Sequence, residues 1–292
     1  MDEVLVQVVA GISRGGLYFL IAAGLTLTLG ALNVINLAHG SFYMVGAYVT
    51  ALLIETYGTG TGFLLAWFVA PLVVVALAVL IEFTIMRRTY LRGHFVQLLA
   101  TFAVLLIIDD LVRSFFGTDP RTAGRVEFLS GSVNAFGLPV AKYNFFVVGV
   151  SGVIAIVLFL VLNKSMWGRR IRASVDDPEM VSTSGMNLKA LRLGLFTLGA
   201  GLAGIAGVVV APSTAVRPGM DVEIIITAFA VTIIGGLGSV SGALAGAMIV
   251  GVVESLGVLY IERGSIAIIF VIMALVLAFR PTGLFGREEA SH

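Results

Sequence analysis

Long apolar runs cover most of this chain and restrict it to helices that cross a membrane. A membrane-spanning helix needs about 20 apolar residues. By that length criterion, runs lie at residues 4–30, 34–54, 63–86, 95–116, 143–162, 188–211, 224–238, 242–259 and 264–280. The runs do not alternate between polar and apolar residues, as the strands of a membrane β-barrel do. The sequence therefore predicts an all-α, polytopic transmembrane helical bundle.

The composition leaves no room for a separate soluble domain. Only 12% of the residues are charged, against about 25% in a typical soluble protein. The segments between the runs are shorter than the roughly 50 residues that a domain needs, so we expect residues 1–292 to form a single transmembrane domain. The net charge of +1 gives no electrostatic reason to expect a nucleic-acid partner.

No catalytic or metal-binding constellation is visible in the sequence. His39, His94 and His292 are scattered, and neither a zinc-protease motif nor a phosphate-binding loop is present. We therefore expect a protein that is not an enzyme and that holds no metal or cofactor itself. Energy for transport would come from another chain or from an ion gradient.

Basic residues predict the orientation of the chain. Cytoplasmic loops of membrane proteins carry an excess of Lys and Arg. Eleven of the 18 basic residues fall in three loops, and these are Arg87, Arg88, Arg92, Lys164, Arg169, Arg170, Arg172, Lys189, Arg192, Arg280 and Arg287. This distribution predicts a cytoplasmic C-terminus and an N-terminus outside, with residues 117–142 and 212–223 also outside.

Two polar or glycine-rich stretches interrupt the apolar runs. The first contains Asn33, Asn36, His39, Gly40 and Ser41, and the second contains Gly235, Gly236, Gly238, Ser239 and Ser241. Non-helical backbone persists in a bilayer only where protein or a water-filled cavity satisfies it. Broken helices at matching positions in two halves of a chain point to a transport site. We therefore predict that these residues border the translocation path and its gate.

The two interruptions align with each other in a weak internal repeat. With an offset that places Gly30 on Gly235, further identities pair Leu32 with Leu237, Ala38 with Ala243, Val45 with Val250 and Gly46 with Gly251. The pattern indicates that a unit of helix, break and helix occurs twice.

The polar residues of the first break have a second interpretation. Asn33, Asn36 and Gly40 would share one face of a continuous helix. Alternatively, the two asparagines cap helix ends and His39 bonds a neighbouring helix. Both interpretations can hold, because a broken helix needs caps where it lines a cavity. The small residues within 199–207 and 242–251 predict close helix packing.

Four carboxylates lie within or at the edges of the runs: Glu82, Asp109, Asp110 and Glu254. Glu82 is near Arg87 and Arg88, and we expect its head to reach the inner surface. Both aspartates are three or four residues from Arg113, which favours local ion pairs. Glu254 has no partner nearby in the sequence, so a proton-coupled transporter would use this residue.

A longer polar loop at about 164–187 is predicted to be cytoplasmic. Asp177 followed by Pro178 is typical of a helix start, and Gly185 of a helix end. Two short helices in a compact loop would suit docking of another protein. The alternative is a solvated connector, although such connectors are usually shorter.

Four motifs resemble those of one transporter family. Residues 24–48, 168–173 with their continuation to Asn187, 235–243 and 280–286 are similar, in the same order, to the motifs of Liv-type branched-chain amino acid ABC permeases. The resemblance covers essentially the whole chain, which is similar to the shorter of the two Liv permeases.

The resemblance implies a multi-subunit importer in the cell (inner) membrane. Its other subunits would be a homologous permease, two cytoplasmic ATPases that bind ATP, and an extracytoplasmic solute-binding protein. The cargo would be branched-chain or related amino acids, or small polar solutes such as urea or amides. The resemblance assigns ATPase coupling to Arg172, Ala173, Asp176, Asp177, Glu179 and Gly185. The alternative is a self-sufficient, proton-coupled secondary transporter.

Overall fold

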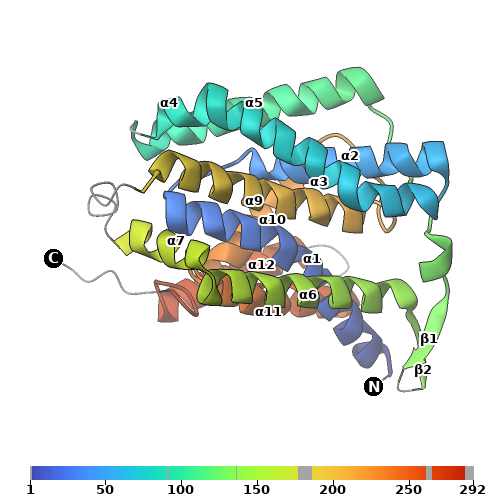
Figure 1. The fold of residues 1–292 in the computed structure, drawn as a ribbon. Helices are drawn as coiled ribbons and strands as arrows, with labels where there is room; N and C mark the ends of the chain where they lie inside the picture. Colours follow the sequence, from blue (N-terminus) through green and yellow to red (C-terminus); the bar gives the residue numbers. More distant parts are fainter. Residues whose placement is uncertain (1, 91, 136, 177–185, 261–264, 287–292) are drawn as a thin grey trace.

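Long helices that run roughly side by side form the protein (Figure 1). The computed structural model describes residues 2–90, 92–135, 137–176, 186–260 and 265–286. The helices are α1 (Asp2–Leu32), α2 (His39–Tyr57), α3 (Thr61–Ile81), the π-helical turn η1 (Glu82–Met86), α4 (Arg87–Thr89), α5 (His94–Phe116), the 3-10 turn η2 (Glu127–Leu129), α6 (Lys142–Lys164), α7 (Met166–Asp176), α9 (Leu188–Val210), α10 (Met220–Gly235), α11 (Val240–Tyr260) and α12 (Ser265–Phe279). The predicted all-α, multi-pass bundle is confirmed.

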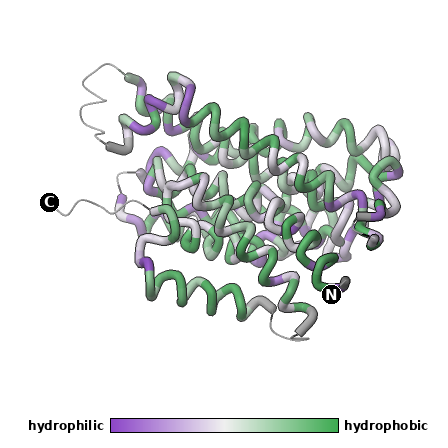
Figure 2. Tube along the Cα trace, turned by 90° about the horizontal axis from the view of Figure 1, so that it is seen from below, coloured by the Kyte–Doolittle hydropathy of each residue, from purple (hydrophilic) through white to green (hydrophobic). Residues whose placement is uncertain are grey.

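Six helices in the described part of the chain are long and apolar enough to cross a membrane. They cover Glu3–Leu32, Thr61–Thr89, His94–Phe116, Lys142–Lys164, Leu188–Val210 and Val240–Val258. Each of the other predicted runs also holds a helix, but α10 has only 16 residues and the apolar part of α12 begins at Ala267. Hydrophobic residues follow most of each long helix, and hydrophilic residues gather near the ends (Figure 2).

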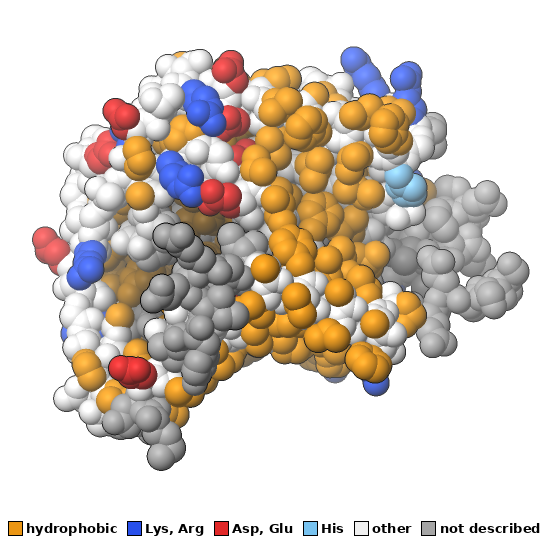
Figure 3. Space-filling model, turned by 180° about the vertical axis from the view of Figure 1, so that it is seen from behind, with side chains coloured by type: hydrophobic (Ala, Val, Ile, Leu, Met, Phe, Trp, Pro, Cys, Tyr) orange, Lys and Arg blue, Asp and Glu red, His pale blue; other side chains and the backbone are white. Residues whose placement is uncertain are grey.

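The outer surface of the bundle is suited to lipid. Large apolar side chains project from the peripheral helices: Phe68 on α3 is 79% exposed and Phe115 on α5 is 80% exposed. From behind, hydrophobic side chains cover a broad area, and charged side chains lie mainly toward the ends of the view (Figure 3). A soluble protein rarely exposes so large an apolar surface.

Helix α1 lies at the centre of the packing, and glycine makes its close contacts possible. A Cβ at Gly15 would lie 2.8 Å from the carbonyl oxygen of Ala247 on α11, and one at Gly24 would lie 2.6 Å from that of Gly199 on α9. Small residues let helix backbones approach in this way. The predicted packing role of the small residues within 199–207 and 242–251 is confirmed.

The first break separates α1 from α2. Asn33 has a φ of 52°, a left-handed conformation that Asn tolerates better than most residues. Asn33 and Asn36 lie in the non-helical connection, so the interpretation that they share a helical face with Gly40 is wrong. His39 begins α2, and its Nε2 donates to the carbonyl oxygen of Ile21 on α1 at 3.0 Å. The expected bond from His39 to a neighbouring helix is confirmed.

The second break meets the first at the same end of the bundle. Gly236 and Gly238, with φ values of 103° and 80°, connect α10 to α11. A Cβ placed on Gly30, in the last turn of α1, would lie 2.1 Å from the Cα of Gly238. The last turn of α1, directly before the first break, therefore packs against the second break.

The opposite end of the bundle carries the N-terminus and a small antiparallel hairpin of β1 (Ser132–Ala135) and β2 (Leu138–Ala141) (Figure 1). An isolated bridge joins Arg121 to Val216, so the segments after α5 and α9 meet there. Arg121 also forms an ion pair of 2.9 Å with Glu55. The two regions predicted to lie on one side of the membrane thus lie together, at the end remote from α7.

Close packing between α1 and α11 predicts that Gly251→Ala destabilises the protein. The added Cβ would lie 2.4 Å from the backbone nitrogen of Gly15, and overpacking of this kind costs about 1–3 kcal/mol. Gly149→Ala on α6 is the matched control, because a Cβ there meets nothing within 4 Å. Thermal unfolding in detergent, followed by size-exclusion chromatography, measures both. Equal melting temperatures for the two variants would contradict this packing.

Candidate functional site

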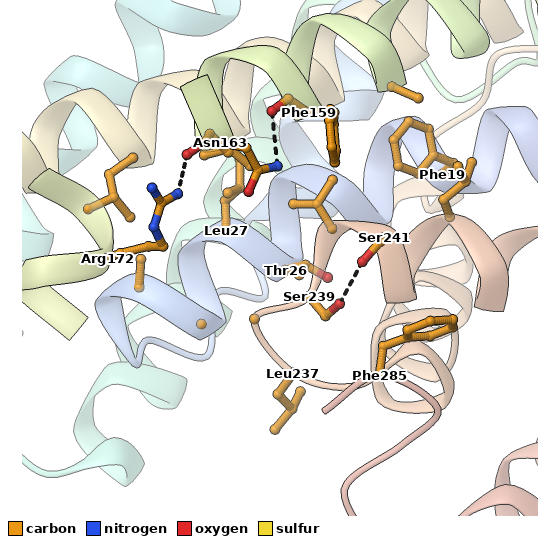
Figure 4. Close-up of a pocket in the computed structure, with 18 residues that line it drawn as sticks. Phe19, Thr26, Leu27, Phe159, Asn163, Arg172, Leu237, Ser239, Ser241 and Phe285 are labelled. Carbon is orange, nitrogen blue, oxygen red and sulfur yellow. Dashed lines mark hydrogen bonds between the residues drawn. The ribbon is translucent and has the colours of Figure 1, made fainter. Parts of the chain in front are cut away.

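A cavity of about 580 Å³ lies at the end of the bundle where the last turn of α1 packs against the second break. Its walls come from α1, α6, α7, α11 and the segment after α12 (Figure 4). Polar lining is provided by Thr26, Asn163, Arg172, Ser239 and Ser241, and apolar lining includes Phe19, Leu27, Phe159, Leu162, Leu237 and Phe285. The volume falls in the usual range of about 300–1,000 Å³ for sites that bind small molecules.

The second break forms one wall of the cavity. The Ser239 hydroxyl accepts from the backbone N–H of Gly242 at 3.0 Å and lies 3.2 Å from the Ser241 hydroxyl (Figure 4). The segment after α12 satisfies carbonyls at the end of α10, because Phe285 N donates to Gly235 O at 2.9 Å. Irregular backbone is thus held by protein contacts, as the membrane interior requires.

The opposite wall is made by α6 and α7. The turn between them is tight: the Ser165 hydroxyl accepts from the N–H of Gly168 at 3.1 Å. The guanidinium of Arg172 donates to the carbonyl oxygen of Leu162 (Figure 4). Ile171 is buried against the same region. These contacts fix α7 to the end of α6 and place Arg172 on the cavity wall.

The structure brings together residues that the sequence assigned to two roles. Gly238, Ser239 and Ser241, expected on the translocation path, line the same cavity as Arg172, expected to couple to an ATPase. Ala173 and Asp176 also lie on α7. Asp177, Glu179 and Gly185, with the second short helix expected there, lie outside the described residues.

Residues of the first break lie elsewhere. Asn33 is exposed, and Asn36 is buried with no hydrogen-bond partner for its side-chain amide among the described residues. His39 and Gly40 are buried at the start of α2. The Ser41 hydroxyl donates to Asp221 on α10 at 3.0 Å. None of these five residues lines the cavity, so their contact with it is indirect, through α1 and Gly30.

The remaining path residues and several unforeseen ones complete the site. Gly235 packs against Gly242, and Gly236 packs against Gly286. Neither Gly235 nor Gly236 lines the cavity itself. The local sequence gave little reason to select Thr26, Asn163 or Phe285. Thr26 is a polar residue inside an apolar run, and Phe285 falls in the final motif, so weak signals existed for both. Asn163 simply marks the end of a run.

Two buried carboxylates are held by protein partners. Glu254 has no partner nearby in the sequence, but it accepts from the Tyr18 hydroxyl of α1 at 2.6 Å and pairs with Arg14 of α1 at 3.5 Å. Glu82 is 1% exposed and accepts from the Tyr90 hydroxyl at 2.7 Å, so it does not reach toward the surface.

The expected ion pair on α5 is confirmed. The Arg113 Nε lies 2.7 Å from Oδ2 of Asp109, and the other carboxylate oxygen of Asp109 accepts from the N–H of Gly219 at 3.0 Å. In the described ranges, no group of three or more His, Cys, Asp or Glu side chains is placed to hold a metal ion.

A bundle of apolar helices with broken segments and a cavity at one end is the architecture of a multi-pass membrane transport protein. Residues 7–279 match the family described as the permease component of branched-chain amino acid transport systems, and the chain belongs to this family.

Relatives cover nearly the full chain. It is 29% identical to the high-affinity branched-chain amino acid transport permease BraD of Pseudomonas aeruginosa, across 97% of this chain and 96% of the relative. The identity to the LivH permease of Escherichia coli K12 is also 29%, with the same coverage. The LivM permease of that organism is 25% identical, but the match covers only 67% of LivM. No solved structure gave a significant match.

Accessibility of the cavity can be measured with thiol reagents, because the chain contains no cysteine. Ser241→Cys is expected to react with a water-soluble maleimide at least about tenfold faster than Thr232→Cys, since reaction depends on exposure of the thiol. Ser241 is exposed on the cavity wall, whereas Thr232 is fully buried. Mass spectrometry of the protein in lipid nanodiscs follows both reactions. If Ser241→Cys reacts as slowly as Thr232→Cys, water does not reach this wall of the cavity.

Proposed function

We propose that the chain is the permease subunit of an ABC importer that carries branched-chain or related amino acids into the cytoplasm. The carrying observation is that α7 and the second helix break share one cavity, in a chain that belongs to the branched-chain amino acid permease family. The cavity gives α7 a direct structural connection to the segment that would open and close.

The gate is the second break. Gly236 and Gly238 hold left-handed conformations that suit a hinge, and Ser239 and Ser241 present hydroxyls to a polar solute. The first break borders this gate, because Gly30, in the helical turn before that break, packs against Gly238. The residues assigned to the first break are Asn33, Asn36, His39, Gly40 and Ser41. Gly235 completes the gate by packing on Gly242.

ATPase coupling is assigned to the loop at about 164–187. Arg172 is bound to the carbonyl of Leu162, so a displacement of α7 reaches the end of α6 and the cavity wall directly. Ala173 and Asp176 lie on the same helix, and Asp177, Glu179 and Gly185 continue the loop. Coupling between sites of this kind is typically worth about 1–3 kcal/mol.

We assign the ATPases and the solute-binding protein to opposite ends of the molecule. Two cytoplasmic ATPases would dock at α7, in the cell's inner membrane with the C-terminus inside. A solute-binding protein would dock at the other end, where Arg121 bridges to Val216 and the N-terminus lies. A homologous permease would complete the pathway, and support comes from the similarity of this chain to both LivH and LivM.

Co-purification and uptake test the proposal together. An ATPase subunit is expected to co-purify with the tagged chain, and uptake of labelled leucine into proteoliposomes is expected to need ATP. Arg172→Ala should lower uptake roughly tenfold, because it removes the link between α7 and α6. Arg88→Ala, which removes the same charge from another cytoplasmic loop, should leave uptake near the native rate.

The competing mechanism has a distinct signature. A proton-coupled secondary transporter would retain uptake without ATP and lose it when an ionophore collapses the proton gradient. That result, obtained with the native chain alone, would overturn the importer proposal. Glu254, the carboxylate that such a transporter would use, is paired with Arg14 and accepts from the Tyr18 hydroxyl.

A further inference from the structure

A charged cluster lies between α1 and α11, on the N-terminal side of Phe19, the first residue of α1 that lines the cavity described above. The Arg14 guanidinium is 3.5 Å from one carboxylate oxygen of Glu254, and the Tyr18 hydroxyl donates to the other at 2.6 Å. At 1.5 Å per residue, Arg14 lies about 18 Å from the first residue of α1 and about 27 Å from the last. The ion pair therefore sits deep within the membrane-spanning part of the bundle.

Glycine packing holds the three side chains in place. Gly11 and Gly15 lie one helical turn before Arg14 and Tyr18, and Gly251 lies one turn before Glu254. A Cβ at Gly11 would lie 2.6 Å from the Cα of Val252, and one at Gly251 would lie 2.4 Å from the backbone of Gly15. The two helices cannot slide or separate without losing these contacts, so their backbones are fixed and only the side chains of the ion pair can move apart.

The pair is open on one side. The Arg14 side chain is 41% exposed and that of Glu254 is 14% exposed. Charged side chains at membrane depth face the protein interior or a water-filled pathway, because exposure to hydrocarbon is costly. Polar contacts between α1 and α11 continue toward the N-terminal end of α1, where the Ser255 hydroxyl donates to Gln7 at 2.8 Å. This open face therefore borders water or a solute rather than lipid.

We propose that Arg14, Glu254 and Tyr18 bind the charged head of an α-amino acid during translocation. The Arg14 guanidinium is suited to a carboxylate, which it can hold through two parallel hydrogen bonds. Glu254 accepts from the ammonium group, and the Tyr18 hydroxyl fixes the orientation of Glu254. The assignment rests on the proposed importer function and specifies its substrate class.

The arrangement selects zwitterions for an electrostatic reason. A zwitterion that enters between Arg14 and Glu254 replaces one ion pair by two, so every charge stays paired. An anion or a cation would leave one of the fixed charges without a partner, which is costly in a medium of low dielectric constant. A neutral solute such as urea would separate the pair without replacing it. The site therefore favours amino acids over urea and simple amides.

Ligand discrimination by the assembled complex tests this assignment. The complex of the chain with its partner permease and ATPases is placed in lipid nanodiscs without the solute-binding protein. Displacement of labelled leucine is then measured with leucine, with leucinamide, which lacks the carboxylate, and with 4-methylpentanoate, which lacks the ammonium group. The native complex is expected to bind leucine roughly tenfold or more tightly than either analogue, as loss of one charged partner requires.

Each variant should lose one kind of discrimination. Glu254→Gln is expected to remove the preference for leucine over 4-methylpentanoate and to keep the preference for leucine over leucinamide. Arg14→Gln is expected to remove the preference over leucinamide and to keep the preference over 4-methylpentanoate. A merely structural ion pair would weaken all three ligands equally. Glu55→Gln, which breaks an ion pair with Arg121 at the end of the bundle, is the matched control and should change neither preference.

Tyr18→Phe keeps both charges and removes one hydroxyl, so it gives a result even if a charge variant fails to assemble. It should weaken leucine binding several-fold while leaving both preferences. Equal binding of the three ligands by the native complex, or preferences unchanged in Glu254→Gln and Arg14→Gln, would overturn the assignment. If the native complex shows ATP-driven uptake but binds the three ligands equally, the binding assignment is refuted and the importer function stands. If uptake by the native complex does not depend on ATP, the importer function itself is refuted.

Discussion

The close approach of α1 to the helices around it is the constraint on which the other features depend. Glycines let its backbone meet α11 at Gly15, α9 at Gly24 and the second break at Gly30. Without strong hydrophobic attraction between helices in lipid, such packing supplies much of the association energy. It also fixes the register of α1, so that Thr26 reaches the cavity and Arg14 reaches Glu254. One set of contacts therefore positions both functional regions.

The irregular segments follow from the requirement that backbone polar groups be satisfied inside a membrane. The hydroxyl of Thr101 on α5 donates to the carbonyl of Ile35 and accepts from the N–H of Leu37, each at 3.2 Å, and so supports the first break. The second break is supported by the segment after α12, through Leu284 and Phe285. Because both breaks are held by neighbouring elements, α10 and α11 can end and begin next to a cavity without unpaired backbone in lipid.

The sequence predicts the helices well, because a bilayer accepts only long apolar runs, and it locates both breaks, because glycine and asparagine mark departures from helical backbone. It also predicts that the small residues pack closely. It does not reveal which surfaces meet. Glu254 lies 240 residues from Arg14, and no local pattern connects them. The sequence also does not reveal that Glu82 is buried, with the Tyr90 hydroxyl donating to it in place of solvent. The cavity depends on contacts among α1, α6, α7 and α11, so Asn163 and Thr26 became visible only in three dimensions.

The pairing of Glu254 also bears on how transport is energised. The Arg14 guanidinium pairs with one oxygen of this carboxylate, and the Tyr18 hydroxyl donates to the other. In the binding that we propose, a zwitterion exchanges with this ion pair at constant net charge. A site of this kind binds a solute without consuming a gradient, so the energy for directional movement has to arrive through another element. We propose that helix α7, which Arg172 fixes to the end of α6, receives this energy.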